Sequence, residues 1–356
     1  MVILKEIKKM YNMYKRYKLK KHILNNNHSS LSLDESKKQL KKFKNKGFNL
    51  AESYLFDFKN NDYRDYITTW EAYKPRLNNN KYFLISDDKY LFSIVFGKYI
   101  DVAKTYGLIN YGKVVGIENL NLDNANLYDF IIQENGLVIK DRFGSDGFAV
   151  YVFYVREHKI FYKDKMIDKE ELEKIVNGFK SGIIQSRIHQ GVFENRIFDK
   201  SINTIRVVSL RRKDAQKHEV VAALQRIGSN RSQPVDNFNQ GGYSALIDIK
   251  TGKLGKMISL FDIKDGKKQF YGNHPDTDAK VEGEVIPHWD ELVKKVEEIT
   301  EKLPFYESVA WDFVLKDDGF ALIEINMKSS LNLFQIHHGM RNELLGQKYK
   351  EHGWLD

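Results

Sequence analysis

The chain has 356 residues, of which 42% are hydrophobic and 29% charged, so it can bury a large core and is expected to form two or three subdomains. It contains no cysteine, which excludes disulfides, thiolate metal sites and a cysteine nucleophile, and makes an intracellular location the simplest interpretation. The net charge is +9, but residues 1–50 hold fourteen Lys or Arg against three acids, which leaves −2 for the rest. Nucleic acid is therefore the least expected partner, because the main body has no net positive charge.

Residues 1–50 are predicted to form a basic helical arm. Its apolar residues recur at spacings of 4, 3, 4 and 3, on one stripe of a helix with lysines on the other faces: Ile3, Ile7, Met10, Tyr14 and Tyr17. Such a helix can lie on an anionic membrane through residues 1–24. Packing of the stripe on the protein itself fits the sequence at least as well. No apolar run reaches the roughly 20 residues that span a bilayer.

The next two segments differ in their predicted secondary structure. Residues 51–120 alternate helical and short extended patterns, and form a mixed α/β region that is a candidate acceptor side. Within residues 121–188, two strands are predicted over 136–143 and 148–155, around a turn with two glycines. A helix is predicted to begin after Asp168, with Glu171 three residues later in a capping-box pattern, before a strand that ends at residue 188.

Residues 189–356 read as strands interrupted by single helices. The predicted strands cover residues 203–212, 219–228, 243–249 and 256–262; the predicted helices cover 288–303 and 332–349. Runs of antiparallel-looking strands broken by single helices predict an α+β fold.

The stretch "SVAWDFVLKDDGFALIEIN" predicts a hairpin with an acid inside each apolar strand. Side chains alternate along a strand, so Glu324 and Asn326 share one face, and the partner strand can bring Asp312 onto it. Two carboxylates and an amide oxygen form the ligand set that Mg²⁺ prefers. The alternative is a structural acid pair that is hydrogen-bonded to loop amides.

Lys140 ends a strand and is followed by the glycine turn at residues 144–147, where backbone could approach phosphate oxygens. A solvated strand-edge lysine is the alternative. The order of motifs along the chain favours the phosphate interpretation of Lys140. The lysine and its turn are followed by "IIQSRI", "NTIRVV", "WDF" and "EIN".

This order resembles the ATP-grasp superfamily. The segments "SINTIRVVSL", "LQRIGSNRSQPVDNFNQGGYSALIDIKTGKLG", "NHPDTD", "IPHWDEL" and "FQIHHG" are more closely similar to the sugar-transfer-associated ATP-grasp family of bacterial surface-polysaccharide synthesis, over residues 136–339. The resemblance implies an α+β ATP-grasp fold, with two subdomains enclosing ATP and a helical N-terminal extension. Residues 121–188 would carry the phosphate lid and adenine hinge, and residues 189–356 the metal and substrate site.

The implied catalytic cations are Lys140 and Arg206. The implied ATP contacts are Lys140, Gly144, Ser145, Gly147, Gln185, Ser186, Arg187, Ile188, Asn203 and Arg206. The implied Mg²⁺ ligands are Asp312, Glu324 and Asn326. Gln185 stands where many relatives have Glu, and Asp278 where Gly is expected.

The candidate substrate residues are Arg226, Asp236, Asn237, Gly241, Gly242 and His274. A plain β-turn is the alternative for the loop at 236–242 and a loop cap for His274, while Arg231 fits a strand-face ion pair better than a substrate contact.

Transfer of the ATP γ-phosphoryl group to a carboxylate makes an acyl phosphate that an amine can attack, and this needs Mg²⁺ and cations but little covalent chemistry from the protein. We therefore expect a ligase that joins an amino acid or amine to a sugar acid for a capsule or other surface polysaccharide, in the cytoplasm or at the inner face of the membrane. The alternatives are a sugar kinase-like phosphotransferase, or a non-catalytic ATP-binding scaffold that the arm tethers to glycan-assembly proteins.

Overall fold

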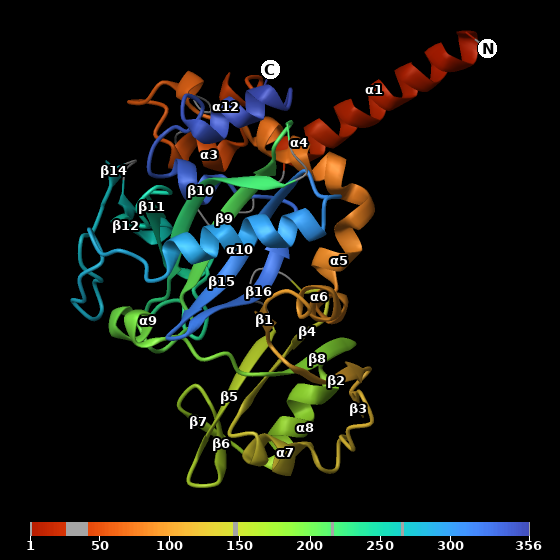
Figure 1. Cartoon of the computed structure of the whole chain (residues 1–356), viewed down its shortest axis with the longest axis vertical. Helices are drawn as coiled ribbons and strands as arrows, with labels where there is room; N and C mark the ends of the chain where they lie inside the picture. Colours follow the sequence, from red (N-terminus) through yellow and green to blue (C-terminus); the bar gives the residue numbers. More distant parts are fainter. Residues whose placement is uncertain (1, 26–41, 145–148, 215–216, 265–266, 356) are drawn as a thin grey trace.

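The computed structural model describes residues 2–25, 42–144, 149–214, 217–264 and 267–355. Two seven-stranded sheets lie one beyond the other along the long axis, and helix α1 (Val2–Asn25) projects from the end that also carries the C-terminus (Figure 1). Within these residues, none of the helices combines the length and apolar character that crossing a membrane requires.

The smaller sheet has the strand order β3-β2-β8-β4-β5-β6-β7 and is antiparallel throughout. Its strands are β2 (Thr105–Asn110), β3 (Lys113–Gly116), β4 (Leu137–Asp141), β5 (Val150–Arg156), β6 (Lys159–Tyr162), β7 (Lys165–Ile167) and β8 (Ser181–Ser186). Helices α7 (Leu127–Gln133) and α8 (Lys169–Asn177) lie beside it. The core between them contains the fully buried Ile139, Phe153 and Ile184.

The larger sheet has the order β1-β16-β15-β9-β10-β11-β12, and only β1 runs parallel to its neighbour among the described strand pairs. Its strands are β1 (Asp101–Val102), β9 (Thr204–Arg211), β10 (His218–Ile227), β11 (Tyr243–Ile247), β12 (Leu254–Ser259), β15 (Ser308–Lys316) and β16 (Gly319–Asn326). A separate ribbon pairs β13 (Ile263–Lys264) with β14 (Lys267–Lys268).

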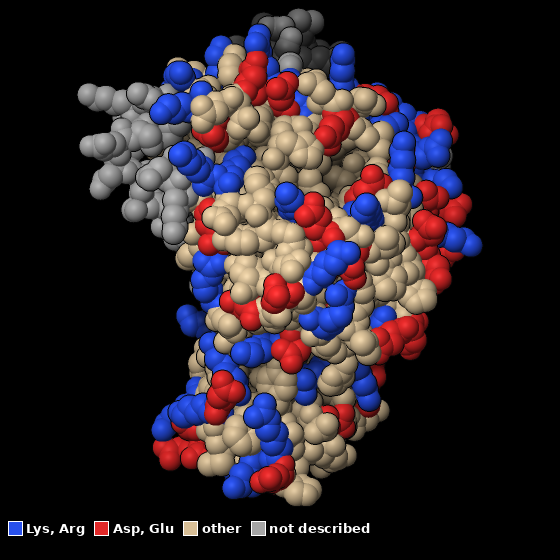
Figure 2. Space-filling view, turned by 90° about the vertical axis from the view of Figure 1, so that its left-hand side faces the viewer, with Lys and Arg blue, Asp and Glu red and all other residues tan. Residues whose placement is uncertain are grey.

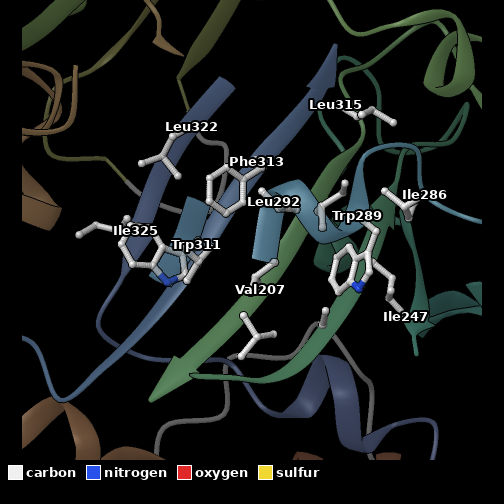
Figure 3. Packing of buried hydrophobic residues seen from close by; sticks show 14 of the residues in the cluster. Val207, Ile247, Ile286, Trp289, Leu292, Trp311, Phe313, Leu315, Leu322 and Ile325 are labelled. Carbon is white, nitrogen blue, oxygen red and sulfur yellow. The ribbon is translucent and has the colours of Figure 1, made fainter. Parts of the chain in front are cut away.

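Helix α10 (Trp289–Lys302) covers one face of the larger sheet (Figure 1). Leu292, Val296 and Ile299 follow the 4 and 3 spacing of an amphipathic helix, and all three are buried. Figure 3 shows Leu292 close to Phe313 of the sheet, and Val207 belongs to the same cluster.

The opposite face is covered by α11 (Asn332–Gln335), α12 (Leu344–Glu351) and the segment around α3 (Leu50–Leu55), with Phe48, Phe334 and Tyr349 fully buried. Residues 42–44 are also helical. Further helical elements of the described residues are η1 (Tyr63–Asp65), α4 (Thr69–Asn79), η2 (Asn80–Tyr82), α5 (Phe83–Asp87), α6 (Lys89–Phe96), α9 (Val192–Ile197), η3 (Phe238–Gln240) and η4 (Leu260–Asp262).

The segment from α6 to β2 connects the two sheets. Phe92 and Phe96 of α6 pack in the larger sheet's core, β1 pairs with β16, and β2 pairs with β8 of the smaller sheet. The ends of β4 and β16 are thereby held near one another at the junction (Figure 1).

The predicted acid hairpin is confirmed as the antiparallel pair β15–β16. The predicted helix start is also confirmed, because the Asp168 side chain accepts a hydrogen bond from the Glu171 N–H at 2.8 Å. The single predicted helix over 332–349 is wrong: the chain forms α11 and α12 with a loop between them. In that loop a Cβ at Gly339 would meet the Asp65 carbonyl oxygen at 2.4 Å, and the Arg341 N–H donates to the same oxygen, so packing against η1 interrupts the helix.

Candidate functional site

The hairpin brings three of the predicted site residues together. Asp312 lies opposite Glu324 in the register of β15 and β16, and Asn326 follows two residues later on the same face. The Asn326 Nδ2 donates to Asp312 Oδ2 at 3.3 Å and to Glu324 Oε1 at 3.1 Å. Asp312 is buried, whereas the Glu324 side chain is 36% exposed and so can reach a ligand.

Arg206 on β9 lies directly opposite Asp312 and forms a two-pronged ion pair with it. Its Nε donates to Oδ1 at 2.7 Å and its Nη2 to Oδ2 at 2.6 Å. Burial alone would raise the pKa of Asp312, but the charge and hydrogen bonds of Arg206 hold that pKa below its usual value. Burial and the neighbouring Asp312 charge raise the pKa of Glu324.

This arrangement fits a hard cation. The Asn326 amide lies within hydrogen-bond distance of both carboxylates, and carboxylate and amide oxygens suit Mg²⁺. The amide turns its nitrogen toward the acids, so it would have to rotate to offer its oxygen to a cation. Among the described residues there is no group of three or more His, Asp or Glu side chains placed to hold a metal ion, so a cation here would depend on the Asn326 amide and on other ligands such as phosphate.

Arg226 on β10 extends the positive charge along the sheet. Its Nη2 lies 3.0 Å from Asp236 Oδ1 and its Nη1 lies 3.4 Å from Asp312 Oδ2, while Thr204 Oγ1 donates to Asp236. The Arg226 Nε is buried and has no hydrogen-bond partner among the described residues. Arg226 therefore links the hairpin to the predicted substrate loop.

The loop at 236–242 turns sharply before β11. Asn237 caps η3 by accepting from the Asn239 N–H at 2.9 Å, and Gly241 adopts φ 102°, a left-handed conformation that favours glycine. A Cβ at Gly242 would meet the Asp236 carbonyl oxygen at 2.6 Å. Local backbone geometry therefore explains both glycines.

Three predicted or considered residues are engaged by the protein itself. The His274 Nε2 lies 2.8 Å from the Gly228 carbonyl oxygen and its Nδ1 accepts from the Asp276 N–H at 3.2 Å, as a loop cap would. Asn203 is fully buried, and its amide bonds to main-chain groups of Glu194, Phe198 and Gly228. Arg231 pairs with Asp262, in line with the ion-pair interpretation.

Lys140 lies near the end of β4, beside Glu324 of the larger sheet. Burial and the positive charge of Lys89 lower the pKa of Lys140 to about 8, and the Glu324 carboxylate acts in the opposite direction. Lys89, at the start of α6, donates from its Nζ to the Gly144 carbonyl oxygen, and burial also lowers its pKa. Two ammonium groups thus meet beside Glu324. Sequence reasoning identified Lys140 but missed Lys89.

The ion pair between Asp88 and Arg142 positions the start of α6 and so the adjacent Lys89. Arg142, just after β4, donates from Nε to Asp88 Oδ1 at 2.7 Å and from Nη2 to Oδ2 at 2.5 Å. Asp88 also caps α6 by accepting from the Tyr90 N–H at 2.9 Å. No local sequence signal gives Lys89, because its position depends on a contact between residues 54 apart in the chain.

The predicted hinge lies at the end of β8. The buried Gln185 donates from Nε2 to Thr105 Oγ1 at 3.1 Å, and Ser186 exchanges two hydrogen bonds with the main chain of Lys104. The Arg187 guanidinium lies 4.1 Å from the centre of the Tyr154 ring. Ile188 follows β8 and is half-buried. In the predicted phosphate turn Gly144 is described, whereas Ser145 and Gly147 lie outside the described residues.

Comparison with solved structures finds ligases of low overall similarity. D-alanine–D-alanine ligase from Bacillus anthracis is 13% identical, with 76% of this chain and 62% of that chain covered and a TM-score of 0.35. D-alanyl-alanine synthetase A from Vibrio cholerae is 10% identical, with 75% and 65% covered and a TM-score of 0.42. The chain thus spans less than two thirds of either ligase. A comparison with curated proteins gives no match.

A family model gives the clearer result. The model described as "Sugar-transfer associated ATP-grasp" matches residues 69–347, which is most of the chain and includes both sheets. It also includes Lys89, Lys140, Arg206 and the acid hairpin. The chain therefore belongs to the sugar-transfer associated ATP-grasp family and has the α+β ATP-grasp fold.

Proposed function

We propose that the protein is an ATP- and Mg²⁺-dependent carboxylate–amine ligase, which joins an amino acid or amine to a sugar acid during synthesis of a capsule or other surface polysaccharide. The family supports ATP as the nucleotide and its description supports a link to sugar transfer. We place the reaction in the cytoplasm or at the inner face of the membrane, where nucleotides and activated sugars are made.

One observation carries the proposal: Lys140 of the smaller sheet and Lys89 at the start of α6 converge on an acid of the larger sheet. Lys89 and Lys140 approach Glu324, which lies beside the Asp312–Arg206 pair. Ammonium groups beside carboxylates can hold a triphosphate and a cation at one point. In this proposal Lys140 and Lys89 bind phosphate oxygens, beside Gly144, whose carbonyl oxygen accepts from Lys89.

The hinge and the hairpin complete the ATP site. Gln185, Ser186, Arg187 and Ile188 would border the adenine, with Asn203 supporting the loop behind them. Asp312, Glu324 and Asn326 would hold Mg²⁺, which when bound supplies positive charge between the phosphate oxygens.

The reaction then proceeds in two chemical steps, each a nucleophilic displacement. A carboxylate oxygen of the acid attacks the γ-phosphorus and ADP leaves, giving an acyl phosphate. The amine nitrogen attacks the acyl carbon, the bond to phosphate breaks, and the amine proton passes to water. The charge that develops in both steps would be stabilised by Arg206 and Arg226, which lie beside Asp312 of the hairpin. The loop containing Asp236, Asn237, Gly241 and Gly242 would position the acceptor.

The basic helix α1 would bring the protein to its substrates. Met13, Tyr14 and Tyr17 are 63%, 55% and 63% exposed among basic side chains, a pattern that suits an anionic membrane surface or an acidic partner in glycan assembly.

The test is ADP release across a panel of amino acids paired with uronic acids. The ligase predicts release that requires both a carboxylate and an amine, together with an acyl phosphate that hydroxylamine traps as a hydroxamate. Release with a sugar alone, and phosphate on its hydroxyl, would instead establish the phosphotransferase.

Lys140 offers a second test. Lys140→Ala should weaken Mg·ATP binding at least tenfold in calorimetry, because a buried ammonium that faces the phosphates is lost. Lys159→Ala, an exposed lysine of the same sheet, is the matched control and should bind normally. Equal affinities in both variants would remove Lys140 from the site.

A further inference from the structure

A hollow of about 180 Å³ lies where α1 meets the body of the protein. Its walls come from α1, the turn at residues 46–47, the segment from η1 to α4, and the loop before α12. Figure 1 places these elements around α4, at the far end of the larger sheet from β4. The hollow is therefore separate from the proposed ATP site.

Positive charge dominates the walls. Lys20, Lys46, Arg64 and Arg341 line the hollow together with one acid, Glu71. The Glu71 side chain is 2% exposed, and its Oε2 lies 2.7 Å from Arg341 Nη1. These two charges compensate each other, so Glu71 adds little repulsion for an incoming anion.

The charges of the other three cations, Lys20, Lys46 and Arg64, are not neutralised by a buried ion pair among the described residues. Within the described chain neither Lys20 nor Lys46 is paired with a carboxylate. The Lys20 Nζ lies 5.8 Å from the Trp70 ring centre and the Lys46 Nζ lies 5.9 Å from that of Tyr63, and aromatic faces of this kind hold an ammonium without neutralising it. Arg64 pairs with Asp62, but its side chain is 75% exposed, where such a pair is weak.

We propose that this hollow is a binding site for a phosphate-bearing anion. A water molecule takes roughly 30 Å³ of liquid and drug-sized ligands need roughly 300 Å³ or more, so a space of about 180 Å³ suits a phosphate or diphosphate group. A single carboxylate offers two oxygens, too few for Lys20, Lys46 and Arg64, which come from three segments, while Arg341 is already paired with Glu71. Phosphate offers more oxygens and up to two charges, and arginine binds it in a forked geometry.

The anion would also fasten α1 to the body. Lys20 belongs to α1, whereas Lys46, Arg64 and Arg341 belong to other segments, so a ligand that bridges them stabilises the docked helix. The source is either a soluble phosphate compound or the headgroup of a lipid. Both present the same phosphate group to the same basic side chains.

The first arm of the test uses soluble inorganic pyrophosphate and calorimetry on the full chain, in wild type and in Lys140→Ala. Binding at the hollow is the part that Lys140→Ala retains, because that variant weakens only the ATP site. The double variant Lys20→Gln/Lys46→Gln should bind at least tenfold more weakly than wild type. The matched control Lys18→Gln/Lys21→Gln removes two charges of α1 outside the hollow and should change affinity less than twofold. Equal losses in the two variants, or no saturable binding by wild type, would overturn the proposal.

The second arm distinguishes the sources with vesicles that contain phosphatidic acid or phosphatidylglycerol at equal surface charge. If the ligand is a headgroup, wild type should bind more tightly to phosphatidic acid, whose phosphate is terminal. Among the variants, only Lys20→Gln/Lys46→Gln, the hollow variant, should lose that preference. Pyrophosphate binding without any lipid preference assigns the site to a soluble compound. Pyrophosphate should also slow proteolysis of α1 in wild type and not in the hollow variant, and unchanged proteolysis of wild type would contradict the bridging geometry.

Discussion

Asp312 shows how a buried charge is compensated from a distant part of the sequence. An ionised carboxylate inside a strand core costs several kcal/mol unless cations or hydrogen bonds offset it. No Lys or Arg lies near Asp312 within its own strand, and the compensation comes from Arg206 on the neighbouring strand, about a hundred residues earlier in the chain. Glu324 is compensated less closely by Arg206, whose Nη2 is 3.9 Å away, and it also lies beside Lys89 and Lys140.

Glu324→Gln should therefore separate a metal ligand from a structural acid. Removing one of two like charges should leave the apo melting temperature unchanged or raised, because the raised pKa of Glu324 reflects burial and repulsion by Asp312. The rise in melting temperature that Mg·ATP causes in wild type should disappear. Glu307→Gln, whose carboxylate is 32% exposed beside Arg211, is the control and should keep the rise.

The opposite pattern would count against the metal assignment. A structural acceptor predicts an apo variant destabilised by roughly 1–3 kcal/mol that Mg·ATP still stabilises. Thermal melts of wild type and both variants, with and without Mg·ATP, give the answer.

We predict that the buried His218 of the larger sheet makes the folded protein less stable at acid pH. It is fully buried, with Nδ1 2.9 Å from Ser209 Oγ and Nε2 3.0 Å from the Tyr306 carbonyl oxygen, and burial lowers its pKa from 6.5 to about 4. Below pH 6.5 the His218 side chain binds a proton in the unfolded chain but not in the folded protein. The contribution of His218 to stability should therefore fall between pH 6.5 and 4, by at most about 1.4 kcal/mol per pH unit, and His337, whose pKa is lowered to about 3 by desolvation, adds to the same trend.

Denaturant unfolding at several pH values tests this. His218→Gln should flatten the dependence in that window, although it lowers stability at pH 7. The exposed His158→Gln should leave the slope as in wild type. Parallel curves for wild type and His218→Gln would show that another group titrates.

At the scale of elements, the sequence predicted what depends on local pattern. The hairpin β15–β16 follows from alternation around an Asp-Gly turn, and the start of α8 follows from Asp168 and Glu171. Two other features depend on contacts between residues far apart in the chain, which no periodicity in the sequence encodes. The Arg142–Asp88 pair places Lys89, and the contact of Arg341 with Asp65 interrupts the helix before α12. The pairing of β1 with β16 is of the same kind, since it links two-residue β1 to a distant strand.

The Asp88–Arg142 pair should couple α6 to the ATP site. Arg142→Gln removes the fork that holds the cap of α6, so Lys89 should lose its position and Mg·ATP affinity should fall roughly tenfold. The control is Arg212→Gln, because Arg212 forms the same two-pronged pair with Asp214 at 3.0 and 2.9 Å, with the Asp214 side chain 70% exposed.

Stability should separate the two variants as well. The Asp88 side chain is 4% exposed, so losing its partner should cost on the order of 3 kcal/mol, against less than about 1 kcal/mol for the exposed pair. Calorimetry and chemical denaturation measure the two effects. Normal nucleotide binding by a folded Arg142→Gln protein would show that α6 does not position Lys89 for phosphate.

At the scale of the whole molecule, the charge is divided between α1 and the rest. Figure 2 shows Lys and Arg interspersed with Asp and Glu over one face of the body, without a continuous basic stripe. The net of +11 in residues 1–50 is therefore the main source of the total of +9. Long-range attraction to an anionic surface should act through this arm.

Removal of residues 1–24 should abolish co-sedimentation with vesicles of phosphatidylglycerol, while Mg·ATP binding persists, because the nucleotide site draws on later segments. Raising the salt should reproduce the loss in the full chain, since charges are screened within about 10 Å at 0.1 M ionic strength. The triple variant Lys18→Gln/Lys20→Gln/Lys21→Gln keeps the helix and is the matched test of charge. Co-sedimentation that survives both the substitutions and high salt would assign the attachment to another surface. A truncated chain that no longer folds, beside a triple variant that folds and sediments normally, would show that α1 packs on its own protein and does not meet the membrane.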